Sequence, residues 1–267
     1  MLKDITLGQF IPGDTVAHRL DPRTKLILTV LYIVALFSAE GWQAYLLATI
    51  AAAACFILSR VSFGAILRSM KAVVVIIIVT ALLNVFFTKG EPIFTLWFLS
   101  VSREGVRTAF FMALRLTLLI TGTFLLTCTT SPIALMDGLE TLLSPLKKLR
   151  FPVHELAMMM SIALRFIPTL IEETEKIMNA QKARGADFES GGLVRRAKAM
   201  LPLLVPLFVS AFRRADELAV AMESRCYHGD EGRTRMKVLR MRWRDWTALA
   251  LGLAVTAGVI ILARVSP

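Results

Sequence analysis

Five apolar blocks constrain the fold of this chain more than any other feature of its sequence. Their lengths are near the roughly 20 residues that an α-helix needs to cross the hydrocarbon core of a bilayer, and they occupy residues 26–39, 42–58, 72–87, 104–127 and 246–263. Lipid cannot pair with exposed backbone groups, so such blocks form helices rather than isolated strands. The sequence therefore predicts an all-α integral membrane protein with about five transmembrane helices.

Basic residues indicate how these helices are oriented. Arg23 and Lys25 precede the first block, and Arg60, Arg68 and Lys71 follow the second. Lys and Arg concentrate in the cytoplasmic loops of membrane proteins, so we expect a multi-pass protein of the cytoplasmic membrane with its N-terminus in the cytoplasm. The same bias accounts for the net charge of +11, and nucleic acid is not an expected partner.

Two arginines, Arg107 and Arg115, lie within the fourth block. Because of them the sequence predicts the number of spans, about five, only to within one. An arginine at mid-membrane costs about 2.5 to 3.5 kcal/mol and usually faces protein, water or the interface. We interpret Arg107 as reaching the interface and Arg115 as facing a structural partner inside the bundle. The alternative is that Arg115 positions the cytoplasmic helices. Residues 88–103, before this block, are expected to form an external loop or a short interfacial segment.

Residues 128–244 differ from the apolar blocks because charges are dense and prolines recur. The pattern predicts three amphipathic helices, at about 131–143, 153–184 and 193–225. The second would be on the order of 45 Å long. We expect it to be bent at Pro168 and to lack a continuous apolar stretch that could cross the membrane, and so to lie along the inner face or project below it.

The chain is accordingly divided into three parts. Residues 1–127 form an N-terminal membrane domain of about four spans, residues 128–244 a cytoplasmic coupling-helix domain, and residues 245–267 a C-terminal transmembrane helix.

Both long helices are expected to end in an arginine between small residues. We call these ends the first tip, made of Ala183, Arg184 and Gly185, and the second tip, made of Ser224, Arg225 and Cys226. A glycine after a helix and a cation in its last turn are common at any C-terminus. Their repetition favours a specific role, in which two arginines about one helix pair apart each offer a bidentate donor to a carboxylate of a partner.

An enzymatic role has little support in the sequence. His154-Glu155 lacks the second histidine of HExxH, and neither a nucleophile with a base nor a GxxxxGK[ST] phosphate loop is found. Cys55, Cys128 and Cys226 are too scattered to indicate disulfides or a metal site. We therefore expect a non-catalytic protein with no cofactor and no metal, so that any ATP used in its function is hydrolysed by a partner.

Most of the chain resembles the T component (EcfT/CbiQ family) of energy-coupling factor importers, which are ABC-type transporters. The likeness is carried by FIPGDTVAHRLDPRTKL near the N-terminus, by TTSPIALMDGLETLLSPLKKLRFPVHELAMMMSIALRFIPTLIEETEKIMNAQKARGADF and by AVAMESRCY. In that family two Ala-Arg-Gly-type signatures end the coupling helices and dock on two ATPase subunits. The resemblance implies that the first tip is a complete signature and that the second tip retains only its arginine.

The resemblance also implies the partners. These are two ATP-binding cassette ATPases and one substrate-binding S component, besides membrane lipid, and the transported vitamin or transition-metal ion would be chosen by the S component. Both a dedicated and a shared module fit the sequence. Methionine adapts its shape to different partners, which makes a candidate S-component interface of Met158, Met159, Met160 and Met178. Ordinary packing near the membrane is the alternative for these methionines.

Two other functions remain open at this point. One is an ordinary ABC permease that forms its own substrate pathway, which would require a cytoplasmic loop of the EAA type and a polar path through the spans. The other is a membrane-embedded enzyme or scaffold without ATPase partners. Copurification of ATPases with an S component, of ATPases alone, or of neither would distinguish the three.

Overall fold

The computed structural model describes residues 10–88, 92–96, 99–186, 188, 192–229 and 238–265. These residues fall into two compact units. The bundle unit lies within Gly8–Thr141 and Leu239–Pro267, and the crossed-helix unit lies within Leu142–Val238. Within the described residues the chain thus passes between units after residues 141 and 238, whereas the division drawn from charge density is at residues 127 and 244.

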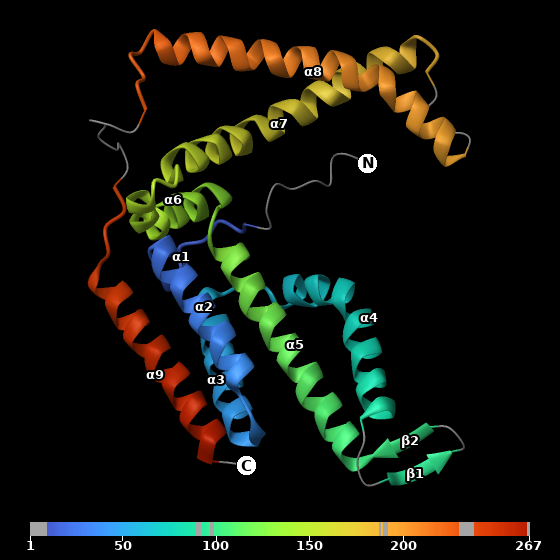
Figure 1. The fold of residues 1–267 in the computed structure, drawn as a ribbon, viewed down its shortest axis with the longest axis vertical. Coiled ribbons are helices and arrows are strands. Elements are labelled where there is room, and N and C mark those ends of the chain that lie inside the picture. Colours follow the sequence, from blue (N-terminus) through green and yellow to red (C-terminus); the bar gives the residue numbers. More distant parts are fainter. Residues whose placement is uncertain are drawn as a thin grey trace. The chain divides into compact units, whose positions relative to one another are not determined.

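The bundle unit confirms the prediction of a helical membrane protein. In Figure 1 the helices labelled α2, α3, α5 and α9 run side by side, and α4 lies against α5. In chain order the elements are α1 (Val16–Arg19), α2 (Pro22–Ser38), α3 (Gly41–Ser59), α4 (Phe63–Phe87), α5 (Arg103–Thr129), α6 (Pro132–Leu143) and α9 (Trp243–Val265). A β-hairpin between α4 and α5 was not predicted. It pairs β1 (Pro92–Leu96) with β2 (Leu99–Ser102) in antiparallel fashion, in a segment whose β-branched and aromatic residues favour strands.

The helices of the bundle unit have lengths that suit membrane spans. By length and composition α3, α5 and α9 can each cross a membrane, and α4 joins them if its halves Phe63–Lys71 and Val73–Phe87, which meet at 60°, count as one span. With 17 residues, α2 lies at the short end of the usual range of about 17 to 25. The five apolar blocks therefore coincide with five helices.

The crossed-helix unit contains η1 (Ser144–Leu149), α7 (Val153–Ala183) and α8 (Leu193–Glu223). One expectation about α7 is wrong, because this helix contains an 18-residue stretch apolar enough to cross a membrane. Its charges gather after residue 171, and Arg165 is the one charged residue between Glu155 and Glu172. The high charge of the helix as a whole hid this stretch. α7 continues as one helix through Pro168.

The core of the bundle unit is built on small residues that let helices approach closely. A Cβ atom at Gly252 of α9 would lie 2.2 Å from Leu28 Cδ2 of α2, and one at Gly122 of α5 would lie 2.6 Å from the Tyr32 ring. One turn beyond Gly252, the Thr256 hydroxyl donates to the Leu31 carbonyl at 3.5 Å. These contacts advance together along α2 and α9, so the two helices are parallel neighbours.

Arg115 has its partners inside the bundle, as the structural interpretation expects. Its Nε donates to the Tyr45 hydroxyl at 2.8 Å and its Nη2 to the Ala39 carbonyl at 3.1 Å. Ala39 follows the last residue of α2, so the guanidinium satisfies a carbonyl that the helix end leaves unpaired. These contacts lie at the α2–α3 turn and do not favour the alternative role. Arg107 is exposed and lies 5.8 Å from the Phe111 ring centroid.

Candidate functional site

The first tip ends α7 in a complete Schellman motif. The Gly185 N–H donates to the Lys182 carbonyl at 2.9 Å, and the Ala186 N–H donates to the Gln181 carbonyl at 3.0 Å. Gly185 has φ +88°, a left-handed conformation that glycine adopts without the steric cost of a Cβ atom. Arg184 is thereby fixed as the last residue before the chain reverses.

The second tip has the same backbone geometry although its sequence differs. The Cys226 N–H donates to the Glu223 carbonyl at 2.9 Å, and the Tyr227 N–H donates to the Met222 carbonyl at 3.1 Å. Cys226 takes the left-handed conformation, with φ 56°, that Gly185 takes at the first tip. Arg225 therefore holds the same place in its turn as Arg184 does, which the sequence does not reveal because cysteine rarely occupies this conformation.

Both arginines face outward. Arg184 and Arg225 are exposed, and among the described residues neither guanidinium takes part in a hydrogen bond or an ion pair. Small or short side chains flank each of them in sequence. A planar guanidinium on a small, well-ordered turn is suited to bidentate binding of a carboxylate on another protein.

One carboxylate fastens α7 to α8, and sequence analysis missed it. Glu173 of α7 accepts hydrogen bonds from the Ser210 hydroxyl and from Nη2 of Arg214, both on α8. Ser210 and Arg214 are four residues apart and so project from one face of their helix. This spacing was the available signal, but nothing local indicates which carboxylate lies opposite.

An apolar groove of about 260 Å³ lies next to this link. α7 contributes Ile162, Phe166 and Leu170, and the α8 residues that line it include Ala211 and Ala215. The alanines, four residues apart, allow the helices to lie close together, and the aromatic and aliphatic side chains of α7 line the groove beside them.

The crossing separates the two tips. α7 and α8 run in opposite directions through it, so their C-terminal ends lie at opposite ends of the pair (Figure 1). At a rise of about 1.5 Å per residue, the stretches 173–183 and 214–223 place the tips on the order of 30 Å apart along the helices. The sequence predicts two arginines about one helix pair apart, and in the structure the tips lie at opposite ends of that helix pair.

Comparison with known proteins supports the resemblance seen in the sequence. The family CbiQ, described as cobalt transport protein, matches residues 13–237. The chain belongs to this family. Three relatives named energy-coupling factor transporter transmembrane protein EcfT are 52, 53 and 54% identical to the chain, in Clostridium kluyveri, Thermosediminibacter oceani and Heliobacterium modesticaldum. The alignments cover 99, 97 and 98% of this chain and 98, 98 and 97% of the relatives. The CbiQ family that the sequence predicts is thus confirmed.

The four methionines predicted at an S-component interface all lie on α7 of this CbiQ-family chain. Met159 and Met160 are exposed, at 54 and 47%, and Met158 and Met178 are partly exposed. They are spread over more than one face of the helix, since Met158, Met159 and Met160 are consecutive. Among the described residues, no three His, Cys, Asp or Glu side chains are grouped so that they could hold a metal ion.

Proposed function

We propose that this CbiQ-family chain is the non-catalytic coupling subunit of an energy-coupling factor importer. It transmits the motion of two ABC ATPase subunits to one S component, which carries a vitamin or a transition-metal ion into the cell. The observation that supports this best is the pair of tips, in which two exposed arginines occupy equivalent positions in two equivalent turns. Two equivalent turns suit two similar ATPase partners.

The crossed helices are the elements that transmit this motion. Each arginine is expected to enter a groove on one ATPase and to pair there with a carboxylate, with the small neighbouring residues allowing close approach. The tips are on the order of 30 Å apart along helices of 1.5 Å rise per residue, and α7 and α8 are linked by Glu173. Movement of the two ATPases toward each other would then displace the helix pair as one body.

The proposal includes an orientation. The crossed-helix unit and the N-terminus are assigned to the cytoplasm, where ATP is available, because Lys and Arg are concentrated in and around that unit. Met158, Met159, Met160 and Met178 remain the proposed contact with the S component. The choice of substrate is assigned to that component.

Replacement of the tip arginines tests the proposal directly. Arg184→Ala, Arg225→Ala and the double variant are coexpressed with the ATPases and the S component, and membrane insertion, ATPase copurification and uptake are measured. Loss of one member of a buried charge pair at an interface costs about 2 to 5 kcal/mol, so each variant should weaken ATPase binding at least about tenfold. Uptake should fall while insertion is unchanged.

Arg264→Ala is the matched control, because Arg264 is an exposed arginine at the C-terminal end of α9. This variant should copurify and transport as the unsubstituted chain does. Unchanged uptake in all three tip variants would contradict the proposal. Copurification of ATPases without an S component would instead favour a permease, and copurification of neither would favour an enzyme or scaffold.

A further inference from the structure

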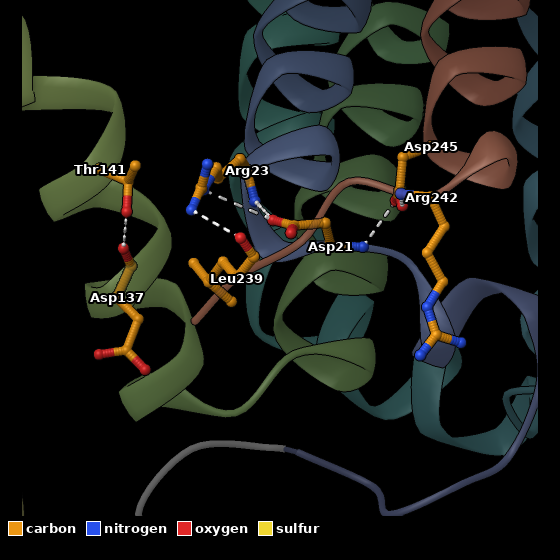
Figure 2. A network of polar contacts seen from close by, with 7 residues as sticks. All are labelled: Asp21, Arg23, Asp137, Thr141, Leu239, Arg242 and Asp245. Atoms are coloured by element: carbon orange, nitrogen blue, oxygen red, sulfur yellow. Dashed lines mark hydrogen bonds and ion pairs between the residues drawn. The ribbon is translucent and has the colours of Figure 1, made fainter. Parts of the chain in front are cut away.

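Among the described residues, two connections of the chain between the units leave the bundle unit beside the first turn of α2. The outgoing connection follows Thr141 in α6, and one turn before it Gly138 packs against α2. A Cβ atom at Gly138 would lie 3.0 Å from Pro22 Cβ and 3.3 Å from the Arg23 nitrogen. The returning connection re-enters at Leu239, whose carbonyl accepts a hydrogen bond from Arg23 Nη2 at 3.4 Å (Figure 2).

Two aspartates join the start of α2 to the start of α9 at the same place. Asp21 caps α2, since its Oδ1 accepts the Arg23 N–H at 3.0 Å. Asp245 caps α9, since its Oδ2 accepts the Arg242 N–H at 2.8 Å. The other oxygen of Asp245 accepts the backbone N–H of Asp21, also at 2.8 Å. One carboxylate therefore serves the N-terminal residues of both helices (Figure 2).

The electrostatics of this arrangement favour a rigid junction. α2 and α9 begin side by side and run parallel, so two partial positive charges of about half a unit each meet there. Asp21 and Asp245 place two carboxylates between them, and both residues are buried, at 7 and 2% exposure. A carboxylate that accepts two backbone N–H groups in a buried site cannot move away without leaving them unpaired.

We propose that the contacts at the first turn of α2 form an anchor that stays closed throughout transport and holds the two connections at one point. The residues of this anchor are Asp21, Pro22, Arg23, Gly138, Leu239 and Asp245. In this proposal α6 keeps its contact with α2 throughout transport, so that movement of the coupling helices begins beyond α6. Asp245 is a positioning residue in this scheme. The inference rests on the proposed coupling function. It identifies the anchor as the part of the chain that stays unchanged while the coupling helices move.

A cysteine pair tests whether the anchor stays closed. Pro22→Cys with Gly138→Cys places two Cβ atoms about 3.0 Å apart, and a shift of a few tenths of an ångström reaches the range of about 3.5 to 4.5 Å found in disulfides. The full complex in liposomes is assayed for uptake in oxidised and in reduced form. Each single cysteine variant is the control for oxidation at Cys55, Cys128 and Cys226.

The oxidised pair is expected to transport as well as the reduced pair. Uptake that is lost on oxidation and restored by reductant would overturn the proposal, because it would mean that α6 separates from α2 during transport. Failure of the pair to form a disulfide in complexes that transport normally when reduced would overturn it as well.

Asp245→Asn tests the positioning role without a cross-link. The asparagine turns one acceptor into a donor against a backbone N–H and so leaves a buried group unpaired. Uptake per ATP hydrolysed is expected to fall about tenfold, while ATPase copurification and the rate of hydrolysis stay unchanged. A merely structural role would reduce copurification and uptake together, and that result, or normal coupling, would contradict the inference.

Asp137→Asn is the matched control. Asp137 lies on α6, one residue from Gly138, and its carboxylate points away from Arg23 (Figure 2). It should leave uptake per ATP unchanged. If the unsubstituted chain fails to copurify with ATPases, the proposed function itself fails. If that chain couples normally and Asp245→Asn does too, the anchor alone is rejected.

Discussion

Cys226 adopts a left-handed backbone conformation, with φ 56°, in the turn that ends α8. A side chain in this conformation costs roughly 1 to 2 kcal/mol relative to right-handed backbone, and glycine avoids the cost. The second tip is therefore a turn of the same shape as the first but with some strain. Its cysteine is exposed, so its neighbours do not explain why a cysteine occupies this position.

We expect Cys226→Gly to stabilise the second tip. Glycine removes the strain at φ 56° but is more flexible when unfolded, so the net gain should be at most about 1 kcal/mol. Hydrogen exchange of the Cys226 and Tyr227 amides, whose bonds close the turn, should slow by up to roughly fivefold.

Gly185→Ala at the first tip gives the opposite comparison. Gly185 has φ +88° with open space around it, so an added methyl group strains the backbone without a clash. Hydrogen exchange of the backbone amides at positions 185 and 186 should become faster. Equal exchange in parent and variant at either tip would show that the left-handed residue does not limit the stability of the turn.

The link between α7 and α8 belongs to the scale of the elements. Glu173 is held by two donors from α8, and its side chain and that of Arg214 are 23 and 33% exposed. Solvent screens such a partly exposed pair, so the ion pair alone should contribute little to the stability of the crossing.

Glu173→Gln should loosen this crossing. Spin labels placed at Ala183 and Ser224 should show a broader distance distribution in the variant, because the amide cannot pair with the Arg214 guanidinium as a carboxylate does. Glu172→Gln is the control, since Glu172 is the adjacent, exposed carboxylate. An unchanged distribution in Glu173→Gln would mean that apolar packing alone fixes the pair.

Two glycines in the bundle offer a comparison of helix contacts. An alanine methyl at Gly252 would meet the end of the Leu28 side chain, which can rotate away, whereas one at Gly122 would meet the Tyr32 ring. That ring is held by a hydrogen bond from its hydroxyl to the Leu118 carbonyl at 3.3 Å. It therefore has less freedom to move.

Gly122→Ala should be the more destabilising of the two substitutions. Overpacking of a core costs typically about 1 to 3 kcal/mol, and we expect Gly122→Ala within this range and Gly252→Ala below it. The melting temperatures of the purified complex in detergent measure the order. The reverse order would show that the Leu28 contact, not the Tyr32 contact, limits how closely these helices pack.

At the scale of the whole molecule, hydropathy predicts the spans but not the junctions. The apolar blocks coincide with α2, α3, α4, α5 and α9 because bilayer thickness fixes the length of each. The apolar stretch of α7 was missed because charges after Glu172 dominate the average over that helix. The hairpin lies in a segment too short and mixed for either pattern.

For the candidate sites, too, the sequence predicts some features and not others. The arginines of both tips are visible in the sequence, since each ends a long periodic helix. The left-handed turn at Cys226 is not, because the residue type argues against it. The contact of Asp21 with Asp245 joins residues 224 positions apart. Its one signal in the sequence is an aspartate shortly before the first and before the last apolar block.

The position of the two connections has a consequence for how such a chain can be altered. Because the chain leaves and re-enters the bundle at one turn of α2, residues 142–238 have the topology of an inserted domain whose ends are neighbours. Domain insertion is tolerated best where the two ends of the insert lie close together at the surface. A chimaera that carries a relative's segment between Thr141 and Leu239 should therefore fold, and would transfer ATPase preference independently of the spans.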